Sequence, residues 1–296
     1  MNPLSCTRAA LAALGLATAS IAWAEGVRAI DARGVEIALA RPAARIVTLA
    51  PNLAEFAFAA GAGAKVVGVS AFSDYPAAAQ RLPIVASQGR VDLERLVALR
   101  PDLVLAWGTG NPARDVARVE ELRIPVFVIE PRTLAGIARA IRDVGTLAAT
   151  EMVAEPAAES FEKQAATLAG VDPVHGPAVF FEIWHAPLMT VSGTHLISEI
   201  VRRCGGRNVF DDLPALAGRV AREALLARDP DVILTTAAGD DSAAALRLWR
   251  DAPMLRAVRN AHIYALDATP IERPGPRVIE GARAVCSALR GAEGRG

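Results

Sequence analysis

VDLERLVALRPDLVLA, residues 91–106, aligns without gaps with VAREALLARDPDVILT, residues 220–235, at a constant offset of 129 positions. Seven of the 16 positions are identical, including the Glu94–Glu223 pair and a Pro-Asp dipeptide. Each stretch predicts a helix that stops before a proline and then a buried apolar strand. Generic α/β chemistry can produce such a likeness by chance, but the gapless match favours two lobes of similar fold.

The same alternation of apolar runs and helical patterns continues through the chain. We predict strands at residues 45–49, 66–69, 103–106, 126–129, 179–183, 189–191, 232–235 and 263–266. A helical stretch over residues 156–169 divides them into two sets. The pattern indicates an α/β fold with mainly parallel sheets in two lobes. Such folds bind ligands at the carboxyl ends of their strands, in the cleft between domains.

Cap and turn residues mark the ends of the predicted elements. We expect Asn52, Asp92 and Thr133 to cap helices, because their side chains can accept hydrogen bonds from free amides of the first turn. Gly61 is expected to end a helix, and Gly34 to form the turn of a hairpin, because both positions need a positive φ.

The first 24 residues predict a signal peptide. Arg8 precedes an uncharged run over residues 9–22 that is short for a bilayer span, and residues 22–24 (Ala-Trp-Ala) fit a cleavage site. A membrane anchor is the alternative. We expect cleavage near Ala24 and a periplasmic location. Loss of Arg8 from the 32 basic residues leaves 31, against 32 acidic ones.

Charge and motif content exclude several classes of function. Without a basic excess to neutralise phosphates, nucleic-acid binding is not expected. The sequence has no nucleophile elbow, no Walker A motif and no paired-cysteine metal site. The glycine-rich residues 61–65 follow a helix rather than a strand, which does not fit a nucleotide loop. We therefore expect no enzyme, no resident metal and no cofactor.

Export would remove Cys6 and leave Cys204 and Cys286. An even cysteine count in an oxidising compartment predicts a disulfide between them. Two buried free thiols are the alternative.

Three motifs carry a family resemblance. They are P-x-x-R-I-V-x-L-x-P-x-x-x-E at residues 42–55, L-E-x-L with R-P-D-L-V within residues 93–104, and E-R-P-G-P-R at residues 272–277. With them, the chain resembles the periplasmic solute-binding proteins that serve ABC importers for cobalamin, haem and iron-siderophores. The resemblance implies two pseudo-symmetric lobes, residues 25–148 and 173–296, joined by one long helix within residues 149–172. Pro156 is expected near the start of that helix, since an interior proline costs ~3 kcal/mol.

Cobalamin-binding members of the family match most closely. The matching stretches are G-V-S-x-x-S-D-Y-P at residues 68–76, A-W-x-x-G-N at 106–111, and C-G-G-x-N at 204–208 together with Cys286, whose pairing with Cys204 matches those members' disulfide. Gln88 and Ala217 stand where those members carry tryptophans. The resemblance therefore implies bound cobalamin or a related corrinoid, with haem or an iron-siderophore as the alternative, and an exported enzyme or metal-storage module as a remoter one.

Aromatic residues on loops are the candidates for contact with a flat macrocycle, because they offer wide apolar surface at little entropic cost. Tyr75 and Trp107 follow strands of the first lobe, and Trp184 and His185 follow a strand of the second. Ordinary packing is the alternative for each. His185 could instead ligate a metal in the ligand, and Tyr75 or His185 would be the axial ligand of a haem carrier.

Three charged residues complete the expected sites. The resemblance places Arg273 against the ligand, whereas a structural ion pair with Glu272 or Glu280 is the alternative. It also implies that Glu94 and Glu223, one from each lobe, dock a monomeric carrier onto arginines of the importer's membrane subunits. The alternative for these glutamates is a favourable interaction with the helix dipole alone.

Overall fold

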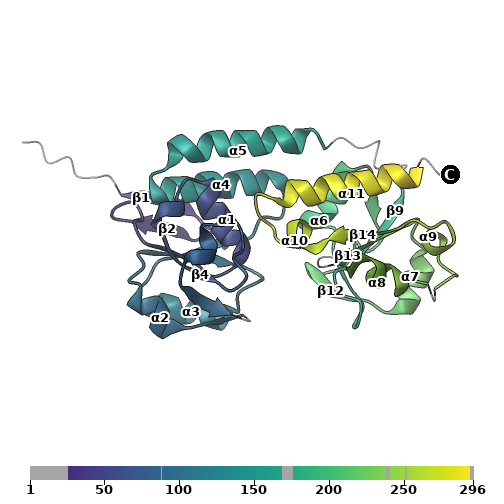
Figure 1. Cartoon of the computed structure of the whole chain (residues 1–296), viewed down its shortest axis with the longest axis horizontal. Helices are drawn as coiled ribbons and strands as arrows, with labels where there is room; N and C mark the ends of the chain where they lie inside the picture. Colours follow the sequence, from purple (N-terminus) through teal and green to yellow (C-terminus); the bar gives the residue numbers. More distant parts are fainter. Residues whose placement is uncertain (1–25, 88, 169–175, 238–240, 251, 294–296) are drawn as a thin grey trace, which may run out of the picture.

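The computed structural model describes residues 26–87, 89–168, 176–237, 241–250 and 252–293. The predicted signal peptide, Gln88 and Gly170 lie outside these residues. Figure 1 shows two lobes side by side, each built around a sheet, so the predicted two-lobed α/β architecture is confirmed.

The N-terminal lobe holds a six-stranded sheet of order β6-β5-β4-β3-β7-β8, in which only β6 runs antiparallel. A separate β1–β2 hairpin precedes it, and Gly34 at its turn has the expected positive φ. The strands are β1 Val27–Ile30, β2 Glu36–Leu39, β3 Ile46–Thr48, β4 Val66–Ser70, β5 Ile84–Ser87, β6 Arg90–Val91, β7 Leu103–Trp107 and β8 Val126–Ile129. The helices are α1 Pro51–Ala59, α2 Leu93–Ala98, α3 Ala113–Glu121 and α4 Leu134–Ala148.

The C-terminal lobe holds a parallel four-stranded sheet of order β11-β9-β13-β14 and a small antiparallel pair, β10 with β12. Its strands are β9 Ala178–Phe181, β10 Met189–Val191, β11 Arg207–Asn208, β12 Ala217–Arg219, β13 Val232–Ala237 and β14 Ile263–Asp267. Its helices are α6 Leu196–Arg203, α7 Arg222–Arg228, α8 Ser242–Arg247, α9 Arg256–Arg259, α10 Ala268–Glu272 and α11 Val278–Glu293.

The repeated sequence forms the same unit in both lobes, a helix followed by a central strand. Arg100 and Asp229, at the offset of 129, both adopt positive φ angles, +46° and +35°, where each helix ends. The aspartate of each Pro-Asp turn then accepts hydrogen bonds from backbone amides just before or at the start of the lobe's first sheet strand. Asp102 accepts from Ala44 and Arg45, and Asp231 from Ala178. The repeat is therefore structural as well as sequential.

The linking helix α5, Glu151–Ala166, lies along α4 above the N-terminal lobe and contacts α11 (Figure 1). It begins five residues earlier than predicted, so the placement of Pro156 at its start was wrong, and this proline lies inside the helix. Pro156 cannot donate to the carbonyl of Met152 one turn earlier. Met152 is 90% exposed, so this part of α5 faces solvent.

Two of the three predicted helix caps are confirmed. Asp92 accepts from the amide of Arg95, and Thr133 from that of Gly136. Asn52 was wrongly predicted as a cap, because α1 already begins at Pro51. The buried Asn52 side chain instead donates to the carbonyl of Pro274, in the other lobe.

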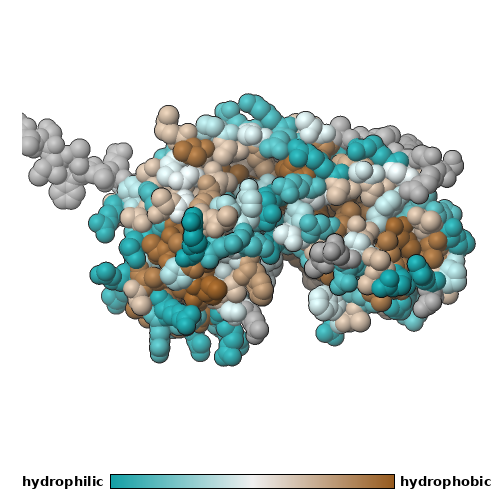
Figure 2. Space-filling view, viewed as in Figure 1, coloured by the Kyte–Doolittle hydropathy of each residue, from teal (hydrophilic) through white to brown (hydrophobic). Residues whose placement is uncertain are grey.

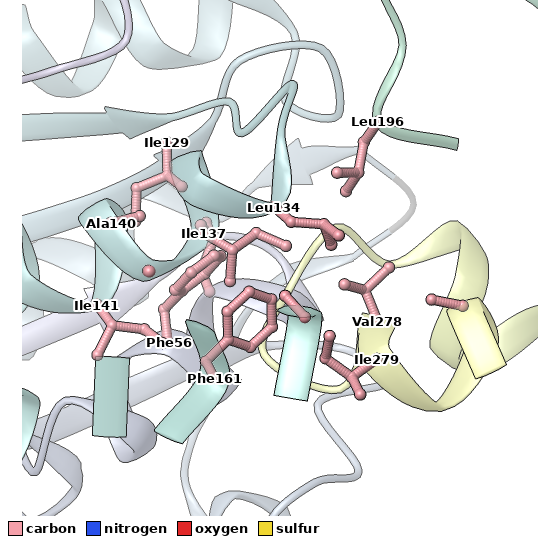
Figure 3. Close-up of a cluster of buried hydrophobic side chains, with 14 of the residues drawn as sticks. Phe56, Ile129, Leu134, Ile137, Ala140, Ile141, Phe161, Leu196, Val278 and Ile279 are labelled. Carbon is pink, nitrogen blue, oxygen red and sulfur yellow. The ribbon is translucent and has the colours of Figure 1, made fainter. Parts of the chain in front are cut away.

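One hydrophobic core runs through both lobes. Figure 3 shows Phe56 and Ile137 of the N-terminal lobe and Phe161 of α5 packed next to Leu196 and Val278 of the C-terminal lobe. Two further clusters are each confined to one lobe. Large apolar contacts between domains oppose relative motion, and this shared cluster is such a contact between the two lobes.

The predicted disulfide is confirmed. Cys204 at the end of α6 bonds to Cys286 in α11, across 82 positions of sequence. Within the described ranges, no helix combines the length and apolar character needed to cross a bilayer.

Candidate ligand-binding cleft

The space-filling view shows a deep notch between the lobes, open on the side away from α5 (Figure 2). Its inner end is a small cavity of about 30 Å³ lined from both lobes, by Trp107, Glu130, Pro131 and Arg132 on one side and His195, Leu196, Leu216, Ile271, Glu272 and Pro274 on the other. Trp107 and Glu130 stand at the carboxyl ends of β7 and β8. The site therefore occupies the place that parallel sheets predict for a ligand.

A larger cavity, of about 550 Å³, lies in the C-terminal lobe beside the notch. Its lining comes from the carboxyl ends of β9 and β13, from α8 and from α10. The lining residues are Glu182, Ile183, Trp184, His185, Ala186, Thr235, Thr236, Ala237, Ala245, Leu248, Ala268 and Glu272. Glu272 lines both cavities, and so connects the two parts of the cleft.

Trp107 is positioned by a polar anchor at the end of β7. Its backbone amide donates to the side chain of Asn111, which itself donates to the carbonyl of Leu49. Its indole N–H is buried and has no hydrogen-bond partner among the described residues. A buried donor without an acceptor costs free energy. A ligand or a water molecule that accepts from this indole N–H would remove that cost.

Trp184 and His185 both line the larger cavity. Trp184 is 61% exposed and offers an open aromatic face. The Nδ1 atom of His185 lies 2.6 Å from the buried carboxylate of Glu182, and its Nε2 atom lies 3.1 Å from the guanidinium of Arg222. Because a guanidinium can only donate, this geometry makes Nε2 the acceptor from Arg222 and Nδ1 the donor to Glu182.

Arg273 crosses the seam between the lobes. Its guanidinium lies 2.6 Å from the carboxylate of Asp74, so the structural ion pair that was the alternative exists, but with neither Glu272 nor Glu280. Burial alone would raise the pKa of Asp74, but the hydrogen bond and charge of Arg273 lower it below its usual range. Arg273 thus lies between the lobes, and its guanidinium is already paired with Asp74.

Tyr75 lies apart from the other candidate residues. It lines a cavity of about 470 Å³ formed by α1, α5 and α11. The guanidinium of Arg277 stacks over its ring at 4.3 Å and also binds Glu55 of α1 at 2.7 Å. The structure therefore brings Trp184 and His185 together, and links Trp107 to them through Glu272, but does not place Tyr75 in either of those cavities.

Several cleft residues were missed from the sequence. They are Glu272, Thr236 and Leu248, which line the larger cavity. Burial raises the pKa of Glu272, against a hydrogen bond from Thr236 that lowers it. The position of Glu272 directly before Arg273 in a recognised motif was the available signal.

Glu94 and Glu223 are exposed on the first turns of α2 and α7, and neither has an ion-pair partner among the described residues. Figure 1 shows α2 at the lower left, in the N-terminal lobe, and α7 at the right, in the C-terminal lobe. Each lobe therefore carries one of the two exposed glutamates. In the described residues, no three His, Cys, Asp or Glu side chains cluster as a metal site would require.

The chain belongs to the periplasmic binding protein family, whose profile matches residues 46–270. Among its curated relatives, the vitamin B12-binding protein of Pectobacterium atrosepticum is 36% identical over 251 residues, which cover 83% of this chain and 88% of the relative. That of Vibrio cholerae is 34% identical over 253 residues, 84% of this chain and 90% of the relative.

Solved structures give the same picture. The periplasmic vitamin B12 binding protein BtuF of Vibrio cholerae superposes with a TM-score of 0.76 at 33% identity, over 85% of this chain and 98% of that one. The periplasmic haem-binding protein BhuT, in complex with two haems, gives 0.72 at 25% identity, over 84% and 98%.

Proposed function

We propose that this chain captures cobalamin or a related corrinoid in the periplasm and delivers it to an ABC importer. The observation that carries the proposal is the 36% identity to a vitamin B12-binding protein over 83% of the chain. The carrier itself performs no chemistry, and ATP hydrolysis by the importer drives uptake. A signal peptide cleaved near Ala24 directs its export, and it works as a monomer.

The cleft offers the surfaces that a corrinoid needs. Trp184 and Leu248 give apolar area to a flat ring, while the free indole N–H of Trp107 and the hydroxyl of Thr236 give polar contacts at its edge. A continuous core across the lobes supports a preformed site, which lowers the ordering cost of binding. In this proposal the ring of Tyr75 contacts the ligand where the two lobes meet. Arg273 gives up its ion pair with Asp74 and binds an amide or phosphate of the ligand instead.

Haem is the second candidate, because a haem-binding protein of known structure shares the fold at 25% identity. His185 is the side chain of the larger cavity best suited to an axial contact, because its Nε2 atom can offer a lone pair to iron once the guanidinium of Arg222, 3.1 Å away, moves off it.

Calorimetry tests the proposal directly. Protein purified after export is titrated separately with cyanocobalamin and haemin, and we expect one-to-one cyanocobalamin binding at micromolar affinity or tighter, with haemin much weaker. Trp107→Leu should weaken cyanocobalamin binding at least tenfold. Met152→Ala, on the exposed face of α5, is the control and should change nothing. Tight haemin binding without any cobalamin signal would transfer the ligand to haem.

A further inference from the structure

The larger cavity is acidic. Its lining contains two carboxylates, Glu182 and Glu272, one histidine and, among the described residues, no lysine or arginine. Two guanidinium groups lie nearby, but Arg222 is held against His185, and Arg273 against Asp74 of the other lobe. Neither guanidinium lines the cavity, so among the described residues an anionic group of a ligand would meet no cation in this wall.

Glu182 is not available to a ligand. It is 2% exposed, and both carboxylate oxygens are occupied, one by Nδ1 of His185 at 2.6 Å and the other by the indole N–H of Trp249 at 2.7 Å. Its role is to hold the wall of the cavity in place.

Glu272 differs from Glu182 on each of these points. It is half-buried and lines both the larger cavity and the small interlobe one. Its Oε1 atom accepts from the hydroxyl of Thr236 at 2.7 Å, whereas its Oε2 atom has no partner among the described residues. The small cavity is also lined by Glu130 and Arg132, whose side chains carry opposite charges. Glu272 thus presents a free acceptor at the point where the two parts of the cleft meet.

We propose that Glu272 makes the cleft select macrocycles with amide substituents over those with carboxylate substituents. An amide N–H₂ can donate to the free oxygen, whereas a carboxylate has only acceptors and would bring two like charges together in a partly buried site. Charge repulsion of this kind separates similar ligands more effectively than apolar contact does. The inference rests on the proposed function and explains how a shared fold would prefer a corrinoid to a porphyrin with propionates.

The test compares cyanocobalamin with cyanocobalamin whose peripheral amides have been hydrolysed to carboxylates. For the wild type we expect the carboxylate form to bind at least tenfold more weakly. Glu272→Gln should reduce this ratio below threefold and strengthen haemin binding, because an amide side chain can donate to a carboxylate. Glu121→Gln, an exposed change at the end of α3, is the matched control and should keep the wild-type ratio.

Two outcomes would overturn the inference while leaving the proposed function intact. One is a wild-type ratio below threefold, which needs no variant and so does not depend on how well Glu272→Gln folds. The other is an unchanged ratio in a folded Glu272→Gln protein that still binds cyanocobalamin. A wild type that binds neither corrinoid would instead reject the proposed function itself.

Discussion

The two lobes share a scaffold but not a site. Both contain the helix, the Pro-Asp turn and the central strand of the repeat, with left-handed residues at matching positions, Arg100 and Asp229. Outside the repeat they diverge. The N-terminal sheet has six strands and the C-terminal sheet four, and the larger cavity and the disulfide belong to the C-terminal lobe alone.

This difference between the lobes separates the elements that both lobes need from those that only one cavity needs. The repeated elements carry what both lobes need equally, namely a stable central strand and, in our proposal, a carboxylate for docking. The ionisable groups of the larger cavity, Glu182, His185 and Glu272, come from segments outside the repeat. The scaffold therefore follows the pseudo-symmetry, whereas the ionisable lining of the larger cavity departs from it.

The largest expected effect concerns docking. Reversing both charges, E94R with E223R, should abolish ligand uptake through the importer and leave the ligand affinity unchanged, because both glutamates are exposed and neither lines a cavity of the cleft. Uptake by cells that lack the native carrier measures the first effect, and calorimetry the second. The control pair E36R and E151R alters exposed glutamates of β2 and α5 and should transport normally. A loss of affinity in E94R/E223R would contradict a docking role.

The disulfide should make the C-terminal lobe the more stable one in oxidising conditions. On the chain-entropy model, a loop of 82 positions corresponds to about 4–5 kcal/mol of unfolding free energy. We expect C204S/C286S to lose about that amount in urea unfolding, and the wild type to lose it on reduction. A loss below 1 kcal/mol would show that the disulfide does not stabilise the protein by restricting the unfolded chain.

Acid sensitivity should also reside in the C-terminal lobe, since all four histidines of the protein lie beyond residue 173. Burial, assisted by the charge of Arg132, lowers the pKa of His195 to about 4. The unfolded chain binds this proton near pH 6.5, so stability present above that pH is lost as the pH falls toward 4, by about 3 kcal/mol.

His195→Asn should remove this part of the pH dependence of unfolding. Asparagine can still accept from the amide of Ile197 and cap α6, so the variant should fold normally. Equal pH profiles for wild type and variant between pH 6.5 and 4 would contradict the assignment.

The smallest expected change in stability concerns the N-cap residues of the two repeated helices. Asp92 caps α2, whereas the equivalent Ala221 has the extended backbone of a cap residue but no side chain to accept a hydrogen bond. Asp92→Ala should lose about 1 kcal/mol, and Ala221→Asp should gain about as much. Urea unfolding of the two variants measures both changes in stability. A destabilising Ala221→Asp would show that residue 221 cannot cap α7 in the way that Asp92 caps α2.

Local rules explain what the sequence determined by itself. The caps Asp92 and Thr133, the turn at Gly34 and most of the strands depend on neighbours within a few residues and were predictable. The short strands β5, β6, β11 and β12 were not predicted. The pairing of Cys204 with Cys286 was also predictable, because export left two cysteines and the family resemblance matched them. Trp107, Trp184 and His185 were found as candidates because they follow strands directly.

Only the tertiary structure decided the contacts between residues distant in sequence. Asn52 has a side chain suited to a cap, but it donates across the seam to Pro274, and Arg273 pairs with Asp74 of the other lobe rather than with an acid of its own. Glu272 became a cleft residue because α10 places it where the two cavities meet. Packing between the lobes sets these partners, and no local pattern encodes it.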